Sequence, residues 1–242
     1  MLGQSRKYIF IVIQFALYGA FLSLDILEKN TILSNRIKFA VVVLCFFYVI
    51  IGKNKKTNRE HIFLIYALFF TVISDILILF TDYYLYGVST FIIAQQFYGM
   101  RITELYNRES SVKSKMNLLR DLLIRLLYQG ALGVLVSMFL LLMNVNIDAL
   151  LGVSIFYFIS ICTNVVRGLK QTLLYRDKRD LKYFAIGMVI FLLCDINVGL
   201  FNMSAFLTVG PRYEMIYSVA AILMWTFYAP SQVLISLSGD SY

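Results

Sequence analysis

Eight long apolar runs constrain this chain more than any other feature of its sequence. Each is close to the roughly 20 residues that a helix needs to cross a bilayer. The runs lie at residues 8–24, 36–51, 62–80, 85–103, 121–142, 147–167, 183–203 and 214–236. The chain is 60% hydrophobic and 15% charged, whereas soluble domains are about 45–50% apolar and about 25% charged. We therefore predict an all-α integral membrane protein with eight transmembrane helices, forming a single domain over residues 1–242.

The first run follows Arg6 and Lys7, a pattern that a secretory signal peptide shares. No small-residue cleavage site follows it. We expect an uncleaved membrane span.

The Lys and Arg residues predict the orientation. With the N-terminus inside, 18 of the 22 lie on the inner side. The four on the outer side are Lys29, Arg36, Lys38 and Arg212. Because cytoplasmic loops carry the excess of basic residues, we expect both termini in the cytoplasm, an even number of spans, and a multi-pass protein of the cell membrane.

Two aspartates lie inside apolar runs, in stretches that look like copies of each other. Ser74-Asp75-Ile76 in the third run matches Cys194-Asp195-Ile196 in the seventh. A polar residue follows each aspartate seven positions later, Asp82 in one copy and Asn202 in the other. With both runs crossing from inside to outside, each aspartate lies roughly 18–20 Å deep, at 1.5 Å per residue. This match favours a parallel repeat of four helices and four helices, with the two carboxylates facing one shared cavity about 4–8 Å apart.

A carboxylate in a membrane span is costly, by about 2.5–3.5 kcal/mol on insertion scales, and usually serves a function. Burial favours the neutral acid, and mutual repulsion opposes ionisation of both groups. One aspartate is then expected to stay protonated while the other is ionised. A proton donor beside an anion suits acid-promoted cleavage through an oxocarbenium-like state, and it equally suits proton relay in a transporter.

Other polar residues recur at helical spacing and predict polar faces beside the aspartates. The fourth run has Phe91, Gln95 and Tyr98, and the eighth has Trp225, Tyr228 and Gln232. We expect the third, fourth, seventh and eighth spans to line one cavity. Gln96, Ser160 and Asn164 are expected to act mainly as hydrogen-bonding contacts between helices.

The composition argues against several other functions. Cys45, Cys162 and Cys194 lie in apolar runs without a spacing pattern, and His61 is the one histidine, so neither a disulfide framework nor a metal site is expected. The net charge of +8 comes from residues between apolar runs rather than from a basic stripe, so no nucleic acid partner is expected.

The chain resembles the YhhN-type membrane proteins, which include the lysoplasmalogenases. The resemblance rests on Ser74-Asp75, on Ala94-Gln95-Gln96-Phe97-Tyr98, on Gly187 to Phe191 followed by Cys194-Asp195, and on Tyr228-Ala229-Pro230-Ser231-Gln232-Val233-Leu234-Ile235. The order and spacing of these motifs and the eight-span topology all agree with the family pattern. Gln95 stands where the family pattern has histidine, and Lys38-Phe39 corresponds to its Lys-Pro.

The resemblance implies hydrolysis of the vinyl ether bond of a lysoplasmalogen, giving a fatty aldehyde and a glycerophospho-base. Asp75 and Asp195 correspond to the two family aspartates and would be the catalytic acid and base. The side chains expected to bind substrate are Lys38, Asp82, Gln95, Tyr98, Asn202, Tyr228 and Gln232, with Lys38 neutralising the phosphate. The expected partners are a lysophospholipid and membrane lipids; no cofactor is required and no oligomeric state is assigned.

Two alternatives to hydrolysis are open. A proton-coupled transporter or lipid-binding protein would need the carboxylates without hydrolysis, and a structural or signalling scaffold would need neither. An enzyme is expected to hold a one-ended pocket at the aspartates, whereas a transporter needs access from both sides.

Overall fold

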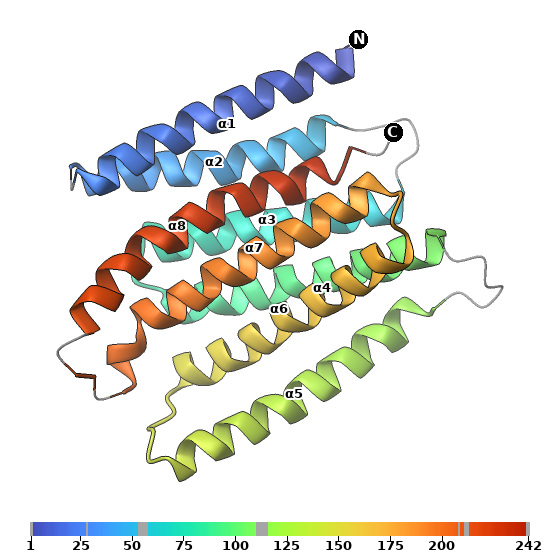
Figure 1. Cartoon of the computed structure of the whole chain (residues 1–242). Coiled ribbons are helices and arrows are strands. Elements are labelled where there is room, and N and C mark those ends of the chain that lie inside the picture. Colours follow the sequence, from blue (N-terminus) through green and yellow to red (C-terminus); the bar gives the residue numbers. More distant parts are fainter. Residues whose placement is uncertain are drawn as a thin grey trace.

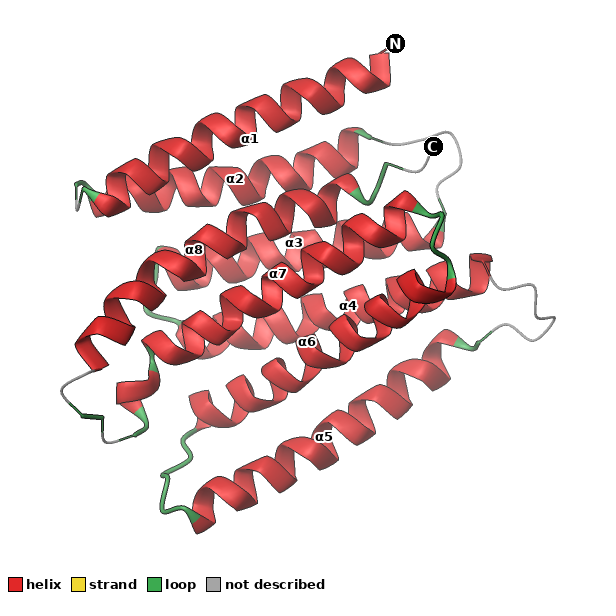
Figure 2. Cartoon of the chain, in the orientation of Figure 1, coloured by secondary structure: helices red, strands yellow, loops and turns green. Residues whose placement is uncertain are grey.

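The computed structural model describes residues 2–27, 29–52, 58–109, 116–207, 209–210 and 213–240. Within these ranges the chain forms eight α-helices, one short 3-10 helix and no strand (Figure 2). The elements are α1 (Leu2–Ile26), α2 (Thr31–Ile51), α3 (Arg59–Leu79), α4 (Tyr84–Glu109), α5 (Leu118–Leu142), α6 (Ala149–Leu174), α7 (Arg179–Phe201), η1 (Met203–Ala205) and α8 (Tyr213–Leu237). Each predicted run coincides with one helix, and three runs extend one or two residues beyond it. The expected orientation was derived from the positions of the Lys and Arg residues. Six of these lie outside the described ranges: Lys53, Lys55, Lys56, Lys113, Lys115 and Arg212.

The helices form one bundle, with α1 and α5 at opposite edges and both termini at the same end (Figure 1). Arg6 near the start of α1 forms an ion pair with Asp240 at the end of the described chain, at 2.8 Å. Tyr48 of α2 donates a hydrogen bond to the same carboxylate. These contacts tie the C-terminal end to the first two helices.

Local sequence explains where several helices begin. Asn30, Asn117 and Asp148 precede α2, α5 and α6, and each accepts a hydrogen bond from backbone N–H groups of the first turn. Such N-caps satisfy donors that the helix itself cannot. Asn30 also adopts a left-handed conformation with φ 45°, which allows the tight turn between α1 and α2.

Pro230 lies inside α8 and removes the backbone donor that would bond the carbonyl of Thr226, four residues earlier. The hydroxyl of Tyr18 on α1 donates to that carbonyl at 3.2 Å. A freed carbonyl in a membrane helix needs such a replacement partner, so this bond fastens α1 to α8.

Within the described residues, seven of the eight helices are long and apolar enough to cross a membrane, which makes this a multi-pass membrane protein. The helix that falls short of this criterion is α4. It carries Gln95, Gln96, Arg101, Glu104 and Arg108 and packs against α3, α5 and α6. A helix surrounded by other helices can hold polar residues that a lipid-facing helix cannot. In contrast, α5 at the edge exposes large apolar side chains such as Leu127 and Leu142.

The packing of the first four helices matches that of the last four. The most extensive contacts are those of α3 with α4 and of α7 with α8. The contact of α2 with α3 has its counterpart in that of α6 with α7. The contact of α4 with α6 has its counterpart in that of α8 with α2. The two copied aspartates therefore lie in helices with equivalent neighbours.

Candidate functional site

Asp75 lies near the C-terminal end of α3, four residues before Leu79, and is buried, with 4% of its surface exposed. The hydroxyl of Tyr228 on α8 donates to its carboxyl group, at 2.9 Å from Oδ1 and 2.8 Å from Oδ2. Both residues were singled out from sequence, and the structure brings them into direct contact. A tyrosine hydroxyl held against both oxygens fixes the orientation of the carboxyl group.

Asp195 lies at the equivalent place in α7 and is partly exposed. Its partner is Tyr157 of α6, whose hydroxyl donates to Oδ2 at 2.8 Å. Sequence reasoning missed Tyr157. The signal was present, because Tyr157 precedes Ser160 and Asn164 at helical spacing and so extends the polar face of α6.

A row of aromatic rings connects the two aspartate–tyrosine pairs. The ring of Phe191 packs on Tyr228 with centroids 5.5 Å apart and on Phe91 at 6.0 Å. Phe91 in turn packs on Tyr157 at 5.6 Å. Each aspartate therefore has its own tyrosine, and two phenylalanine rings lie between the tyrosines. The expected separation of the two carboxylates stays a prediction.

Three of the other predicted substrate-binding residues are fully buried: Gln95 and Tyr98 on α4, and Gln232 on α8. The side-chain oxygen of Gln95 accepts a hydrogen bond from Asn164 at 2.9 Å. Its amide nitrogen has no partner within the described residues, and neither do both polar atoms of Gln232. The hydroxyl of Tyr98 lies near the side chain of Thr71 but forms no hydrogen bond of ordinary geometry within the same residues. Leaving such a group unpaired costs about 1–3 kcal/mol. Unpaired groups in this number would be satisfied by polar groups of a bound molecule or by water.

These side chains converge through helical spacing. Gln232 follows Tyr228 by one turn, and Tyr98 follows Gln95 by almost one turn, so each pair shares a face. Tyr98, Tyr157 and Tyr228 all belong to one continuous buried cluster. Helices α3, α4, α6, α7 and α8 therefore all contribute to this region, and α6 is the helix that the sequence analysis did not include.

Close helix packing holds the two aspartate-bearing helices in place. A side chain at Gly87 of α4 would meet Ile78 of α3, with its Cβ 2.6 Å from Cγ1. A side chain at Gly187 of α7 would meet Ile235 of α8 at 2.8 Å and the carbonyl oxygen of Ser231 at 3.1 Å. Gly87 permits the close approach of α4 to α3, which carries Asp75. Gly187 permits the close approach of α8 to α7, which carries Asp195.

Lys38, which is expected to neutralise the substrate phosphate, has a charged partner in the structure. It is buried in α2 and forms an ion pair with Asp25 at 2.8 Å. Its ammonium group lies 4.6 Å from the ring centroid of Trp225, which packs edge-on against Tyr228 at 5.5 Å. Lys38 thus contacts a ring that packs against Tyr228.

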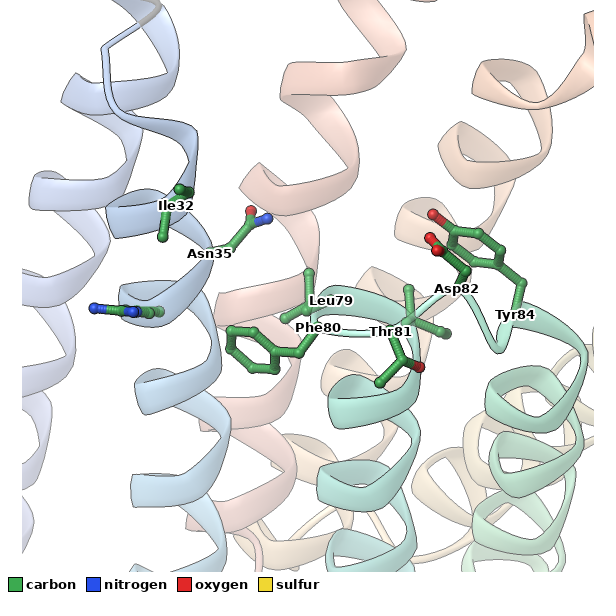
Figure 3. A pocket seen from close by; sticks show the side chains of 9 residues that line it. Ile32, Asn35, Leu79, Phe80, Thr81, Asp82 and Tyr84 are labelled. Atoms are coloured by element: carbon green, nitrogen blue, oxygen red, sulfur yellow. The ribbon is translucent and has the colours of Figure 1, made fainter.

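Two further predicted residues lie at the surface. Asn202 is exposed at the C-terminal end of α7, where its amide donates to the carbonyl of Val198 at 2.9 Å. Asp82 is exposed in the turn between α3 and α4. It lines a cavity of about 400 Å³ at the end of the bundle opposite the termini (Figure 3).

A second polar layer lies between α4, α5 and α6 and has a structural role. Gln96 donates to the side-chain oxygen of Gln129 at 3.2 Å, and Ser160 donates to the same oxygen at 3.2 Å. Arg125 donates to the side-chain oxygen of Gln96 at 3.1 Å. The expectation that Gln96, Ser160 and Asn164 join helices is confirmed by these bonds and by the bond of Asn164 to Gln95.

At the end of the bundle that holds the termini, Glu109 joins α4 to the start of α7. It pairs with Lys178 at 2.9 Å and with Arg108 at 2.7 Å. Partial burial acts to raise the pKa of Glu109, but the two cations outweigh it and hold the pKa below its usual range. Among the described residues, no three His, Cys, Asp or Glu side chains gather as metal ligands would.

Comparison with known proteins identifies one family. The profile of the YhhN family matches residues 34–239, from α2 to the end of α8. No curated protein and no solved structure matches the chain.

Proposed function

The chain belongs to the YhhN family, and we propose that it hydrolyses the vinyl ether bond of lysoplasmalogens or of a related lysophospholipid ether. The products would be a fatty aldehyde and a glycerophospho-base. One observation carries the proposal: two carboxyl groups inside the membrane domain are each held by a tyrosine hydroxyl, with unpaired polar groups buried nearby.

The reaction divides into two proton transfers. A protonated aspartate gives its proton to the vinyl carbon that is not bonded to oxygen, and the double bond electrons form the new C–H bond. The remaining carbon and the ether oxygen share the positive charge of an oxocarbenium ion, which an ionised carboxylate stabilises. Water then adds to that carbon and loses a proton to a carboxylate. The hemiacetal breaks into aldehyde and alcohol, so that one water is consumed and no cofactor is changed.

The surrounding side chains would position the reactants. Tyr228 and Tyr157 would orient the two carboxyl groups, and the proposal requires that the carboxyl oxygens of both reach one substrate atom or one water. The free polar atoms of Gln95, Tyr98 and Gln232 would bond the attacking water and the glycerol hydroxyl. The apolar chain would lie among the rings that surround the site.

A lipid-binding or proton-coupled transport protein is the second candidate, and Gln95 favours it. An amide cannot exchange a proton in the working pH range, unlike the histidine of the family pattern. The side-chain oxygen of Gln95 already accepts a hydrogen bond from Asn164, and its amide nitrogen, which has no partner among the described residues, can donate to a ligand.

The test is release of fatty aldehyde from a lysoplasmalogen by purified protein in detergent micelles. Asp75→Asn and Asp195→Asn should each remove most of the turnover, and the double variant should be little worse than either one. Asp148→Asn is the matched control, because Asp148 caps α6 and asparagine caps equally well. Near-normal turnover in a folded Asp75→Asn or Asp195→Asn variant would reject the acid–base role of that residue.

If the unchanged protein releases no aldehyde, Gln95→His separates the two candidates. Gain of hydrolysis would indicate an enzyme that has diverged at this position. Continued absence of hydrolysis would favour lipid binding or transport.

The proposal includes a topology. All eight helices cross the membrane as a parallel repeat of four and four, both termini face the cytoplasm, and the protein lies in the cell membrane. The matched helix neighbours of the two halves support the repeat. Cysteine labelling of the loops after α4 and after α5 tests it, because the two loops should react from opposite sides.

A further inference from the structure

The cavity at the end of the bundle opposite the termini carries two opposite charges that remain uncompensated. Arg36 lies in the second turn of α2, and Asp82 lies in the turn between α3 and α4. Both are exposed. Within the part of the chain that the structure describes, neither forms an ion pair or a side-chain hydrogen bond. Lys38, two residues further along α2, already has Asp25 as its partner.

The rest of the lining is mixed in character. Figure 3 shows Asn35 on α2 facing the turn after α3, with Phe80, Asp82 and Tyr84 around the opposite wall. Ile32 and Leu79 supply apolar surface. A volume of about 400 Å³ suits a small polar group with a short apolar attachment.

The cavity lies close to Asp75 along α3. Leu79, the last residue of this helix, follows Asp75 by four positions, or about 6 Å at 1.5 Å per residue. Asp82 lies just beyond it. In a glycerophospholipid, a comparable length separates the oxygen on the first glycerol carbon from the phosphorus. A lysolipid with its ether bond at Asp75 would therefore place its head group at this end of α3.

We propose that this cavity binds the zwitterionic phosphate–ammonium head group of a lysophospholipid, with Arg36 on the phosphate and Asp82 on the ammonium group. The inference rests on the proposed function for the place of the ether bond. A guanidinium binds phosphate oxygens through two parallel hydrogen bonds. A carboxylate beside the ring of Tyr84 (Figure 3) suits an ammonium group, which aromatic faces also attract. Arg36 takes the role that the sequence analysis gave to Lys38.

The experiment measures binding without hydrolysis, so that it stays informative whether or not the protein cleaves a vinyl ether. The probe is a tritium-labelled 1-alkyl-glycerophosphoethanolamine, a saturated ether without the double bond that would be protonated. Its binding to protein in nanodiscs of uncharged lipid is compared with that of alkylglycerol phosphate, which lacks the ammonium group, and alkylglycerol, which lacks both charges.

Each variant should lose affinity for one charge. Arg36→Gln should weaken both phosphate-containing probes by about three- to tenfold and leave alkylglycerol unchanged. Asp82→Asn should weaken only the phosphoethanolamine probe, by a similar factor. Lys29→Gln is the matched control, since Lys29 is exposed in the preceding loop at the same end of the bundle and lies outside the cavity lining.

Three results would overturn the proposal. The first is that no probe binds to the unchanged protein. The second is that the two cavity variants bind the probes with the same affinity as the unchanged protein. The third is that Lys29→Gln loses as much probe affinity as Arg36→Gln. If aldehyde release is observed while the variants keep the original head-group preference, the head-group site is wrong and the proposed hydrolysis stands.

Discussion

Gly99 of α4 leaves room for the guanidinium group of Arg125, and filling that room should destabilise the bundle. A Cβ at Gly99 would lie 1.8 Å from Nη1 and 2.5 Å from Cζ of Arg125. Arg125 is only 2% exposed. It donates to the side-chain oxygen of Gln96 at 3.1 Å and to Asp121 at 3.1 Å. A contact of ordinary length needs about 3.5 Å, so Gly99→Ala must push the guanidinium group away from these partners.

The expected loss follows from those bonds. A hydrogen bond to a charged group contributes about 1.5–3 kcal/mol, so losing two bonds costs about 3–6 kcal/mol. Alanine recovers up to about 1 kcal/mol through its higher helix propensity. We expect Gly99→Ala to lower the free energy of unfolding by about 2–5 kcal/mol, measured by circular dichroism during transfer from mild detergent into SDS. Gly130→Ala is the control, because no atom lies within 4 Å of its added Cβ, and it should be neutral or slightly stabilising.

A double-mutant cycle tests the cause. Arg125→Met removes the guanidinium group, so Gly99→Ala made in that background should cost almost nothing. If Gly99→Ala costs the same with and without Arg125, the loss comes from another contact and the argument is refuted.

Three further outcomes are expected. Tyr228→Phe and Tyr157→Phe each remove the hydroxyl that orients one aspartate, so each should lower aldehyde release about tenfold without unfolding the protein. A circular dichroism melt should show Gly187→Ala less stable by about 1–3 kcal/mol through overpacking against α8, whereas Gly199→Ala has open space and should show no loss. The pKa of Glu109 is lowered by Lys178 and Arg108. Its ion pairs therefore stabilise the fold above about pH 4.3, the ordinary pKa, and this contribution is lost as the pH falls through the lowered value; Glu109→Gln should have a melting temperature that depends less on pH below 5.

The helices could be predicted from sequence because bilayer length and apolar composition leave little choice of secondary structure. Asp75 and Tyr228 were both identified because each interrupts an apolar run at helical spacing. Periodicity gives the polar face of a helix but not which neighbour that face meets. For this reason the sequence predicted a shared cavity for Asp75 and Asp195 but not their hydrogen-bond partners. In the structure each aspartate accepts a hydrogen bond from a tyrosine of another helix.

Lys38 shows a second limit of prediction from the sequence alone. Its position near the expected outer side predicted that it neutralises the substrate phosphate, and the sequence did not indicate that Asp25 from the preceding helix forms an ion pair with it across a short turn. Such a partner depends on the turn at Asn30, whose left-handed conformation brings α1 and α2 together. The sequence likewise predicted α4 as an ordinary membrane span. Its charged residues are tolerated because other helices surround it, which the sequence did not show.

The most direct measurement of the central claim is the position of hydrogen uptake during hydrolysis in D₂O. Protonation of the vinyl carbon by a deuterated aspartate places one deuterium on the carbon next to the aldehyde group. Reducing the aldehyde to the alcohol as it forms prevents later exchange, and mass spectrometry then locates the label. The account predicts one deuterium at that carbon with the unchanged protein, and loss of the product with Asp75→Asn or Asp195→Asn. Aldehyde without deuterium at that carbon, or no aldehyde from any lysoplasmalogen, would contradict it.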